Sequence, residues 1–443
     1  MIGVIAFVAL VLAIGVPATL LIDRRRTGAA LLGCGFLLGV ALHAAILFLL
    51  SLSGVPWQRT GFIGVIAAAS VLLWVAAWKS GSIPERAVEQ MNKRATAIDL
   101  LTIAIVAGHS LFSTLAPLPE SDFMTIWGLK AKVFWMARGV DFDFLMSPWS
   151  VLFHVDYPIL LPLSYDSLSI IRDSWDDRIV GVLTSFFGAA ALLIVRRSHH
   201  EATGHPVHSA LATLAMASLL LSPWIGLAEG PLVAYILSGI LIVHEGLRAD
   251  RMATVRLGAL LLGCAGLVKN EGMAVIAAAA LALLSAPAGR RNRVIHLWPS
   301  LVVVGAWLVP RAVHGLSTDL ARAGMLDRFL ARLANPSEVL GPIGATWVGR
   351  SMLWCGIALA LAISLRYVVR EERFPLTVVA LQFGAYLAAY LVSPHSLDWH
   401  VRWSWERLVS HMTPTLTFVA LVSLTAAFSE TKESRPVPAS QES

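Results

Sequence analysis

The chain alternates between long runs of apolar residues and short polar connections. The first run, Ile2–Ile22, contains no charged side chain, and several later runs are about as long. An α-helix needs about 20 apolar residues to cross the ~30 Å hydrocarbon layer of a bilayer. The pattern therefore predicts an all-α polytopic membrane protein with about 13 transmembrane helices. They are expected at residues 2–22, 28–52, 61–78, 98–117, 176–195, 206–226, 230–247, 257–268, 272–287, 297–313, 343–365, 375–393 and 408–428.

Two of these expected helices, at 257–268 and 272–287, are shorter than a full span. Arginines flank the pair on both sides, so both flanks should lie on the same side of the membrane. We therefore expect a hairpin of two short helices with Lys269-Asn270-Glu271-Gly272 at its tip.

The longer polar connections predict the domain organisation. The loops at 118–175, 311–342 and 394–407 are expected outside the cell. In the loop 118–175, tryptophan and phenylalanine are interspersed with lysine, which is typical of amphipathic helices at a membrane surface. Within it, Tyr157–Ile171 is expected as a short helix lying at the outer face. One transmembrane domain, 1–428, would comprise four helices in 1–117, the outer loop 118–175 and the remaining helices in 176–428. Residues 429–443 are expected to form a disordered cytoplasmic tail.

Composition excludes several classes of protein. Of the 443 residues, 57% are hydrophobic and only 14% are charged, with a mean hydropathy of +0.72. Soluble domains have about a quarter of their residues charged, so a soluble enzyme is excluded. The three cysteines lie inside apolar runs, which predicts neither a disulfide framework nor a zinc site. The net charge of +6 comes from arginines in the connections, and no nucleic-acid partner is expected.

Basic residues cluster in alternate connections and predict the orientation in the membrane. The clusters are Arg24–Arg26, Lys79–Arg94, Arg196–Arg197, Arg248–Arg256, Arg290–Arg293 and Arg366–Arg373. Cytoplasmic loops carry an excess of Lys and Arg, so these connections and the C-terminus are expected inside, with the N-terminus outside. The cytoplasmic side would carry 20 of the 34 Lys and Arg residues, but only 12 of the 28 Asp and Glu residues.

Ionisable side chains gather near the outer ends of the expected helices. Asp122 follows the fourth helix, and Glu229 lies between the sixth and the seventh. Lys269 and Glu271 are at the hairpin tip, and Arg407 precedes the last helix. An ionisable group close to the membrane is costly and usually faces a cavity or a partner. These connections therefore predict a shared outward-facing site, with ordinary loop charges as the alternative.

Four outer segments carry motifs that occur together in a known superfamily. They are Asp122-Phe-Met-Thr-Ile-Trp127-Gly-Leu-Lys130-Ala-Lys132, His154-Val-Asp156-Tyr157-Pro158, Leu267-Val-Lys269-Asn270-Glu271-Gly272, and Trp399-His400 with Ser404-Trp405-Glu406-Arg407 and Pro414. In this order they resemble the GT-C superfamily of polyprenyl-phosphate-dependent glycosyltransferases, which includes protein O-mannosyltransferases and aminoarabinose transferases of lipid A. The resemblance implies a GT-C-like bundle in the bacterial inner membrane, with an extracytoplasmic active site.

The resemblance also implies a reaction and roles for individual residues. A sugar would be transferred, with inversion, from a polyprenyl-phosphate donor to an unknown glycan, lipid or protein acceptor. Asp122 would be the general base for the acceptor hydroxyl, and Glu229 a second carboxylate. Lys269 and Arg407 would stabilise the leaving phosphate. The other candidate substrate-binding residues are Trp127, Lys130, His154, Asp156, Tyr157, Glu271, His400 and Trp405.

Other interpretations stay open. No cofactor is required by the pattern, but Asp122 and Glu229 could hold a divalent metal ion through oxygen ligands. A transporter or flippase for a lipid-linked saccharide is the main alternative function. Transporters tend to show internal repeats and broken helices near the midplane, whereas this chain has no visible repeat and few midplane ionisable residues, such as His43 and His109. A non-catalytic sugar or lipid binder is the third possibility. The sequence does not specify the sugar, the acceptor or the polyprenyl length.

Overall fold

The computed structural model describes residues 2–83, 92–116, 118, 120–316, 324–347 and 351–433. Parts of the basic connection Lys79–Arg94 and of the loop 311–342, and most of the tail 429–443, lie outside the described residues. All regular structure in the described ranges is helical, as the apolar pattern predicts. The chain is therefore an all-α protein, and its long apolar helices are those of a multi-pass membrane protein.

Nine of the described helices are long and apolar enough to cross a membrane. A tenth span would combine α18 (Ser351–Ile363) with α19 (Leu365–Glu371), which are bent by 82° relative to each other. The nine are α1 (Ile2–Ile22), α2 (Gly28–Leu52), α3 (Arg59–Lys79), α4 (Lys93–Leu115), α8 with α9 (Asp177–Val180, Val182–Thr203), α11 (Glu229–Arg248), η3 with α15 (Asn292–Leu297, Trp298–Val313), α20 (Arg373–Val392) and α21 (Leu397–Glu433).

The expected count of 13 spans is not confirmed, because three expected spans coincide with short helices. These are α10 (Pro206–Leu220), α12 (Met252–Val268) and α13 (Asn270–Leu284). A helix rises 1.5 Å per residue, so 15 residues reach only ~23 Å. The last two do form the expected pair of short helices, joined at Lys269, whose backbone is extended (φ −155°, ψ 152°).

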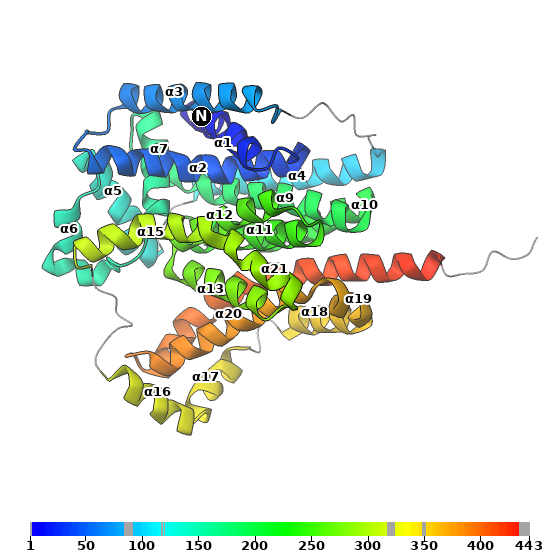
Figure 1. Ribbon diagram of the computed structural model, residues 1–443. Coiled ribbons are helices and arrows are strands. Elements are labelled where there is room, and N and C mark those ends of the chain that lie inside the picture. Colours follow the sequence, from blue (N-terminus) through cyan, green and yellow to red (C-terminus); the bar gives the residue numbers. More distant parts are fainter. Residues whose placement is uncertain are drawn as a thin grey trace, which may run out of the picture.

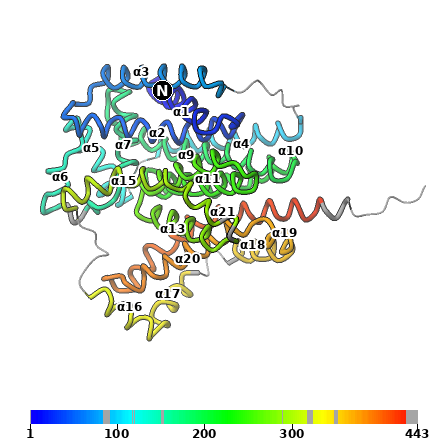
Figure 2. The backbone as a smooth tube through the Cα atoms, viewed as in Figure 1, coloured from blue at the N-terminus to red at the C-terminus, as the bar shows by residue number. Residues whose placement is uncertain are grey.

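The bundle has two ends of different character. Figure 1 shows α2, α9, α11 and α12 side by side, with their long axes running across the picture. At one end the basic connections contact one another: Arg26 pairs with Glu245 at 2.8 Å, and Arg251 pairs with the same carboxylate at 2.6 Å. Figure 2 shows α5 (Gly128–Ala137) and α6 (Phe142–Met146) at the opposite end of the long helices.

Helix α11 forms the centre of the bundle and fixes where the site lies. Nearly all of its side chains are buried, against α9, α12 and α21. The neighbouring helices α1 and α2 approach each other closely at Gly15. A Cβ atom added there would lie 1.8 Å from the carbonyl oxygen of Gly35 on α2, so only glycine allows this approach. Since α11 begins at Glu229, this carboxylate is held at the middle of one end of the bundle.

Two helices differ from the sequence-based expectation. The segment expected at the outer face forms α7 (Leu160–Arg172), and its residues 160–171 are buried inside the protein, against α1, α2 and α5. Helix α21 begins at Leu397 rather than 408, so His400 and Arg407 are helical rather than in a loop. It also continues to Glu433, so the first residues of the expected disordered tail are helical. Polar residues stay helical here because they extend an apolar helix that is already formed.

The connections that the sequence predicts outside the cell are themselves helical. The loop 118–175 contains the π-helical turn η1 (Phe123–Trp127), then α5, α6 and the 3₁₀ turn η2 (Pro148–Phe153). The loop 311–342 contains α16 (Met325–Ala334) and the start of α17 (Ser337–Trp347), and α14 (Ala288–Arg291) precedes η3. The helices of the loops 118–175 and 311–342 lie at the end of the bundle where Glu229 lies. Helix α14 lies at the other end, where the following Arg293 donates to the carbonyl of Leu247.

Candidate functional site

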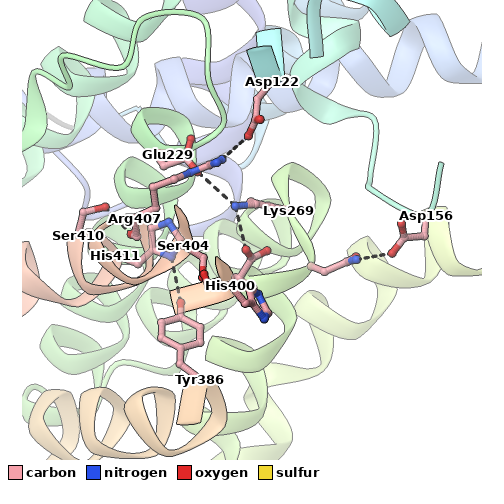
Figure 3. A network of polar contacts seen from close by, with 12 residues as sticks. Asp122, Asp156, Glu229, Lys269, Tyr386, His400, Ser404, Arg407, Ser410 and His411 are labelled. Atoms are coloured by element: carbon pink, nitrogen blue, oxygen red, sulfur yellow. Dashed lines mark hydrogen bonds and ion pairs between the residues drawn. The ribbon is translucent and has the colours of Figure 1, made fainter. Parts of the chain in front are cut away.

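Arg407 joins two carboxylates at this end of the bundle. Its Nη2 atom lies 2.6 Å from Oδ2 of Asp122 and 2.6 Å from Oε1 of Glu229, and its Nε donates to the same Glu229 oxygen at 2.7 Å. Figure 3 shows the guanidinium group between the two acids. One charged group from α21 therefore ties the start of α11 to the loop 118–175.

Lys269 extends this contact into a chain of five charged residues. Its Nζ lies 3.2 Å from Oε1 of Glu229 and 2.8 Å from Oε1 of Glu271. The chain thus runs from Asp122 through Arg407, Glu229 and Lys269 to Glu271. Four segments that are distant in sequence meet here, as the shared-site hypothesis expects. We call these five residues the ionic cluster.

The five side chains differ in exposure. Glu229 is 1% exposed and Lys269 is 6% exposed, whereas Asp122 and Arg407 are each about a quarter exposed, at 26% and 25%. A molecule that approaches the cluster therefore meets Asp122 and Arg407 first. Glu229 and Lys269 form the fixed inner part.

Each of the three carboxylates lies at the start of a helical segment. Asp122 directly precedes η1, Glu229 is the first residue of α11, and Glu271 lies in the first turn of α13. A helix N-terminus carries partial positive charge and free N–H groups, which stabilise an anion. Burial alone would lower the pKa of Lys269, in the turn between α12 and α13, but Glu271 and Glu229 outweigh it and raise this pKa. Lys269 therefore stays protonated.

A stack of aromatic rings supports the cluster from the loop 118–175. Trp127 lies parallel to Tyr157 with ring centroids 5.4 Å apart, and His154 stacks on Tyr157 at 4.8 Å. Nζ of Lys130 donates to the carbonyl of His154 at 2.6 Å. Nζ of Lys269 lies 6.0 Å from the centre of the Tyr157 ring, within range of a cation–π interaction. The stack therefore positions the first loop against Lys269.

The buried members of this stack have shifted pKa values. Lys130 is fully buried, and burial lowers its pKa to about 7, although Asp156 acts in the opposite direction. Burial is also the main reason why the pKa of Tyr157 is raised, with Glu271 adding to it. Tyr157 is therefore neutral at physiological pH, and Lys130 is poised to lose its proton there.

Asp156 links two of the recognised segments directly. Its Oδ2 accepts a hydrogen bond from Nδ2 of Asn270 at 2.7 Å, and its backbone carbonyl accepts one from Nε1 of Trp307 at 3.2 Å. The segment His154-Val-Asp156-Tyr157 is therefore fastened to the turn that carries Lys269. The spacing along the chain gave no sign of this bond.

Two predicted substrate-binding residues contact groups outside the ionic cluster. His400 bonds through Nδ1 to the hydroxyl of Ser393 at 2.7 Å, and Trp405 packs against Phe383 and Tyr390. Trp405 and Trp127 are both buried, so neither ring offers an open face for stacking under a sugar. Sugar contact by these rings stays a prediction that their burial does not favour.

Sequence reasoning missed a histidine beneath the cluster. His411 is 1% exposed, and its Nδ1 lies within hydrogen-bond distance of the Tyr386 hydroxyl, at 3.1 Å. Gln382 donates to the same hydroxyl at 2.7 Å. His411 follows Arg407 by four residues on α21, a spacing that places both on one helix face. The sequence contains this spacing. Because the residues before 408 were expected to form a loop, however, the spacing did not indicate a shared helix face.

No geometry for a metal ion accompanies the two carboxylates. Within the described ranges, no three or more His, Cys, Asp or Glu side chains are grouped as metal ligands would be. Arg407 lies between Asp122 and Glu229, the pair considered for a divalent ion. Its guanidinium group supplies the positive charge that such an ion would bring to these carboxylates.

Comparison with known proteins adds no family to this description. No protein-family model matches the chain, and neither the curated proteins nor the solved structures include a match. The resemblance to the GT-C superfamily thus rests on the four sequence segments, and the activity that it implies is a proposal.

Proposed function

We propose that this protein is a membrane glycosyltransferase that moves a sugar from a polyprenyl-phosphate donor to an acceptor hydroxyl at the extracytoplasmic face. The observation that carries the proposal is the placement of Arg407 between Asp122 and Glu229, with Lys269 beside them. Two cations suited to a lipid phosphate and a partly exposed carboxylate suited to proton transfer lie within one cluster. These are the groups that the transfer of a sugar from a phosphate to a hydroxyl requires.

Arg407 is the group that we expect to bind the donor phosphate. A guanidinium group can bind a phosphate through two parallel hydrogen bonds. Because Arg407 is a quarter exposed, a phosphate can approach it and displace the Asp122 carboxylate. The bonds from Arg407 to Glu229, which is buried, would hold the guanidinium in place during this exchange.

This exchange would also prepare Asp122 to act as a base. Asp122, Glu229 and Glu271 carry three negative charges, against the two positive charges of Lys269 and Arg407. Arrival of an anionic phosphate adds negative charge and withdraws Arg407 from Asp122, and both changes favour protonation of a carboxylate. Asp122 would then accept the proton of the acceptor hydroxyl as this oxygen bonds to the anomeric carbon and the bond to the phosphate breaks.

Glu229 has a different role in this proposal from the one that the sequence analysis assigned. Its Oε1 receives contacts from both Arg407 and Lys269, and its side chain is 1% exposed. A carboxylate in this position holds two cations at a fixed separation more readily than it reaches an acceptor. We therefore propose that Glu229 positions the phosphate-binding cations.

The test is transfer of a radiolabelled sugar by purified protein in detergent, where no compartments exist and transport cannot occur. Synthetic polyprenyl-phosphate sugars serve as donors, and delipidated cell-envelope fractions provide acceptors. We expect transfer by the wild type and almost none by Asp122→Asn. Wild-type protein that binds these donors but transfers no sugar with any acceptor fraction would overturn the proposal and favour a binder or a transporter.

A further inference from the structure

Helix α16 is fixed to the end of a membrane-spanning helix through two arginines. Nε of Arg328 donates to the carbonyl of Val392 at 3.0 Å, and Arg332 donates to the carbonyls of Tyr390, Ser393 and His395 at 2.8, 2.7 and 3.1 Å. The last carbonyls of a helix have no partners within the helix. The two arginines therefore cap α20 and hold α16 against its C-terminal end.

The other side of α16 is apolar and uncovered. Leu326, Leu330 and Leu333 are 66%, 54% and 55% exposed, and no residue of α16 is buried. Their spacing of four and three residues places them in one row along the helix. Because an α-helix turns by about 100° per residue, Arg328 and Arg332 lie on the opposite side of the helix from this row. Ala331 lies between the two sides.

The point of attachment determines the depth of this apolar row. Helix α20 is one of the nine membrane-spanning candidates, and it ends at Val392. The carbonyls that bind Arg332 thus mark the level at which a span leaves the hydrocarbon layer. Figure 1 shows α16 beside this end of α20, on the outside of the bundle. A helix at this level presents its exposed side to the headgroup region.

We propose that α16 is an interfacial helix, whose leucine row inserts into the lipid surface on the side of the ionic cluster. Amphipathic helices of this kind bury their apolar face ~5–10 Å into the boundary between headgroups and acyl chains. Both arginines are bound to backbone carbonyls, so lipid phosphates are not needed for the attachment. The contact is therefore apolar, and it does not depend on anionic lipid. This inference does not rest on the proposed function.

The lipid contact is connected to the ionic cluster through the next helix. Helix α17 follows α16 directly, and its Val339 and Ile343 are buried in one apolar group with Val401 and Trp405 of α21. Arg407 lies on the same helix, half a turn beyond Trp405. The lipid surface, α16, α17 and the helix that carries Arg407 therefore form one continuous path of contacts.

The test places a nitroxide spin label on each side of α16 in full-length protein reconstituted into nanodiscs of a neutral phospholipid. Cys355→Ser removes the exposed native cysteine, since Cys34 and Cys264 are buried. Labels are attached at Leu330→Cys and, as the matched control, at Ala331→Cys, which is also exposed. Collision with oxygen reports lipid, and collision with a water-soluble nickel chelate reports water.

We expect the label at residue 330 to collide more with oxygen than with the nickel chelate, and the label at residue 331 to show the reverse. The same contrast is expected at Leu326→Cys, so one poorly folded variant does not decide the result. Adding anionic lipid should leave the contrast unchanged. Equal exposure of residues 330 and 331 to nickel would overturn the proposal, because the row would then lie in water. Shielding of residue 330 from both reagents would also overturn it, in favour of contact with a second protein.

Discussion

Arg407 and Glu229 form the central contact of the site, although 178 residues separate them along the chain. Two nitrogens of the guanidinium group bind one carboxylate oxygen, at 2.7 Å and 2.6 Å. Glu229 begins a helix that is buried along almost its whole length and cannot move freely, so it fixes the orientation of Arg407. The Nη2 atom of the guanidinium group also contacts Asp122, which lies at the exposed edge of the ionic cluster.

Replacement of Arg407 by Lys should reduce transfer from the lipid donor by about ten- to a hundredfold. Lysine keeps the positive charge next to Glu229 but cannot span two carboxylates or bind phosphate through a planar pair of N–H groups. A hydrogen bond to a charged group contributes roughly 1.5–3 kcal/mol, which corresponds to this range. The measurement is kcat/KM for the polyprenyl-phosphate sugar.

The matched control for Arg407 is Arg402→Lys on the same helix. Arg402 pairs with Asp398 at the surface, and both side chains are about two-thirds exposed or more. This variant should transfer sugar at the wild-type rate. Equal rates for the two variants would show that Arg407 serves only as a structural link.

Asp122→Asn tests the general base. The amide retains the size of the carboxylate and can still accept a hydrogen bond from Arg407, so the protein should fold and insert normally. Loss of general-base catalysis typically costs ~10²–10⁴ in rate, and this loss should appear in kcat with little change in KM for the donor. Glu120→Gln, two residues earlier and exposed, is the control. Full activity of Asp122→Asn would assign the base elsewhere.

Lys130 predicts a pH dependence of stability. Its pKa is about 7 in the folded protein because it is buried, whereas an unfolded lysine titrates near 10.4. Between these values the unfolded chain binds more protons, so the free energy of unfolding rises with pH from about 7 upward. Below about pH 7 Lys130 is charged in both the folded and the unfolded chain, so the folded protein bears the full free-energy cost of burying this charge.

The check is the midpoint of thermal unfolding of purified protein between pH 6 and 9. For the wild type, the midpoint should rise over this range once pH exceeds 7. Lys130→Met should remove that part of the rise, because no buried amine remains to titrate. Lys132→Met, at an exposed position two residues later, should leave the pH profile intact. A profile of Lys130→Met that matches the wild type would contradict the role given to this lysine.

The orientation of the site can be tested with single cysteines at opposite ends of the bundle. In the Cys355→Ser background, Asp143→Cys on α6 should react with an impermeant maleimide in intact cells. Glu201→Cys, at the end of α9 with the basic connections, should react only after lysis. Both positions are exposed. The reverse labelling pattern would place the ionic cluster in the cytoplasm and remove the basis for a lipid-linked donor at the outer face.

The sequence by itself determined that this is a helical membrane protein and where most of its helices lie. Apolar runs of about 20 residues have no stable alternative to a helix in lipid, because every backbone N–H and C=O group must be bonded within the segment. The same reasoning does not fix helix ends. Residues 397–407 include four charged side chains and no continuous apolar run, yet they belong to α21, since an existing helix extends at little cost.

Only the tertiary structure decided which polar residues meet. The sequence predicted a common site for Asp122, Glu229, Lys269, Glu271 and Arg407, but not that Arg407 stands between two acids or that Asn270 binds Asp156. It also placed residues 160–171 at the outer face, whereas α7 is buried. Which groups pair depends on how the ends of α10 to α13 and α20 to α21 come together. That is set by packing between helices, such as the close approach at Gly15, which no periodicity along one helix encodes.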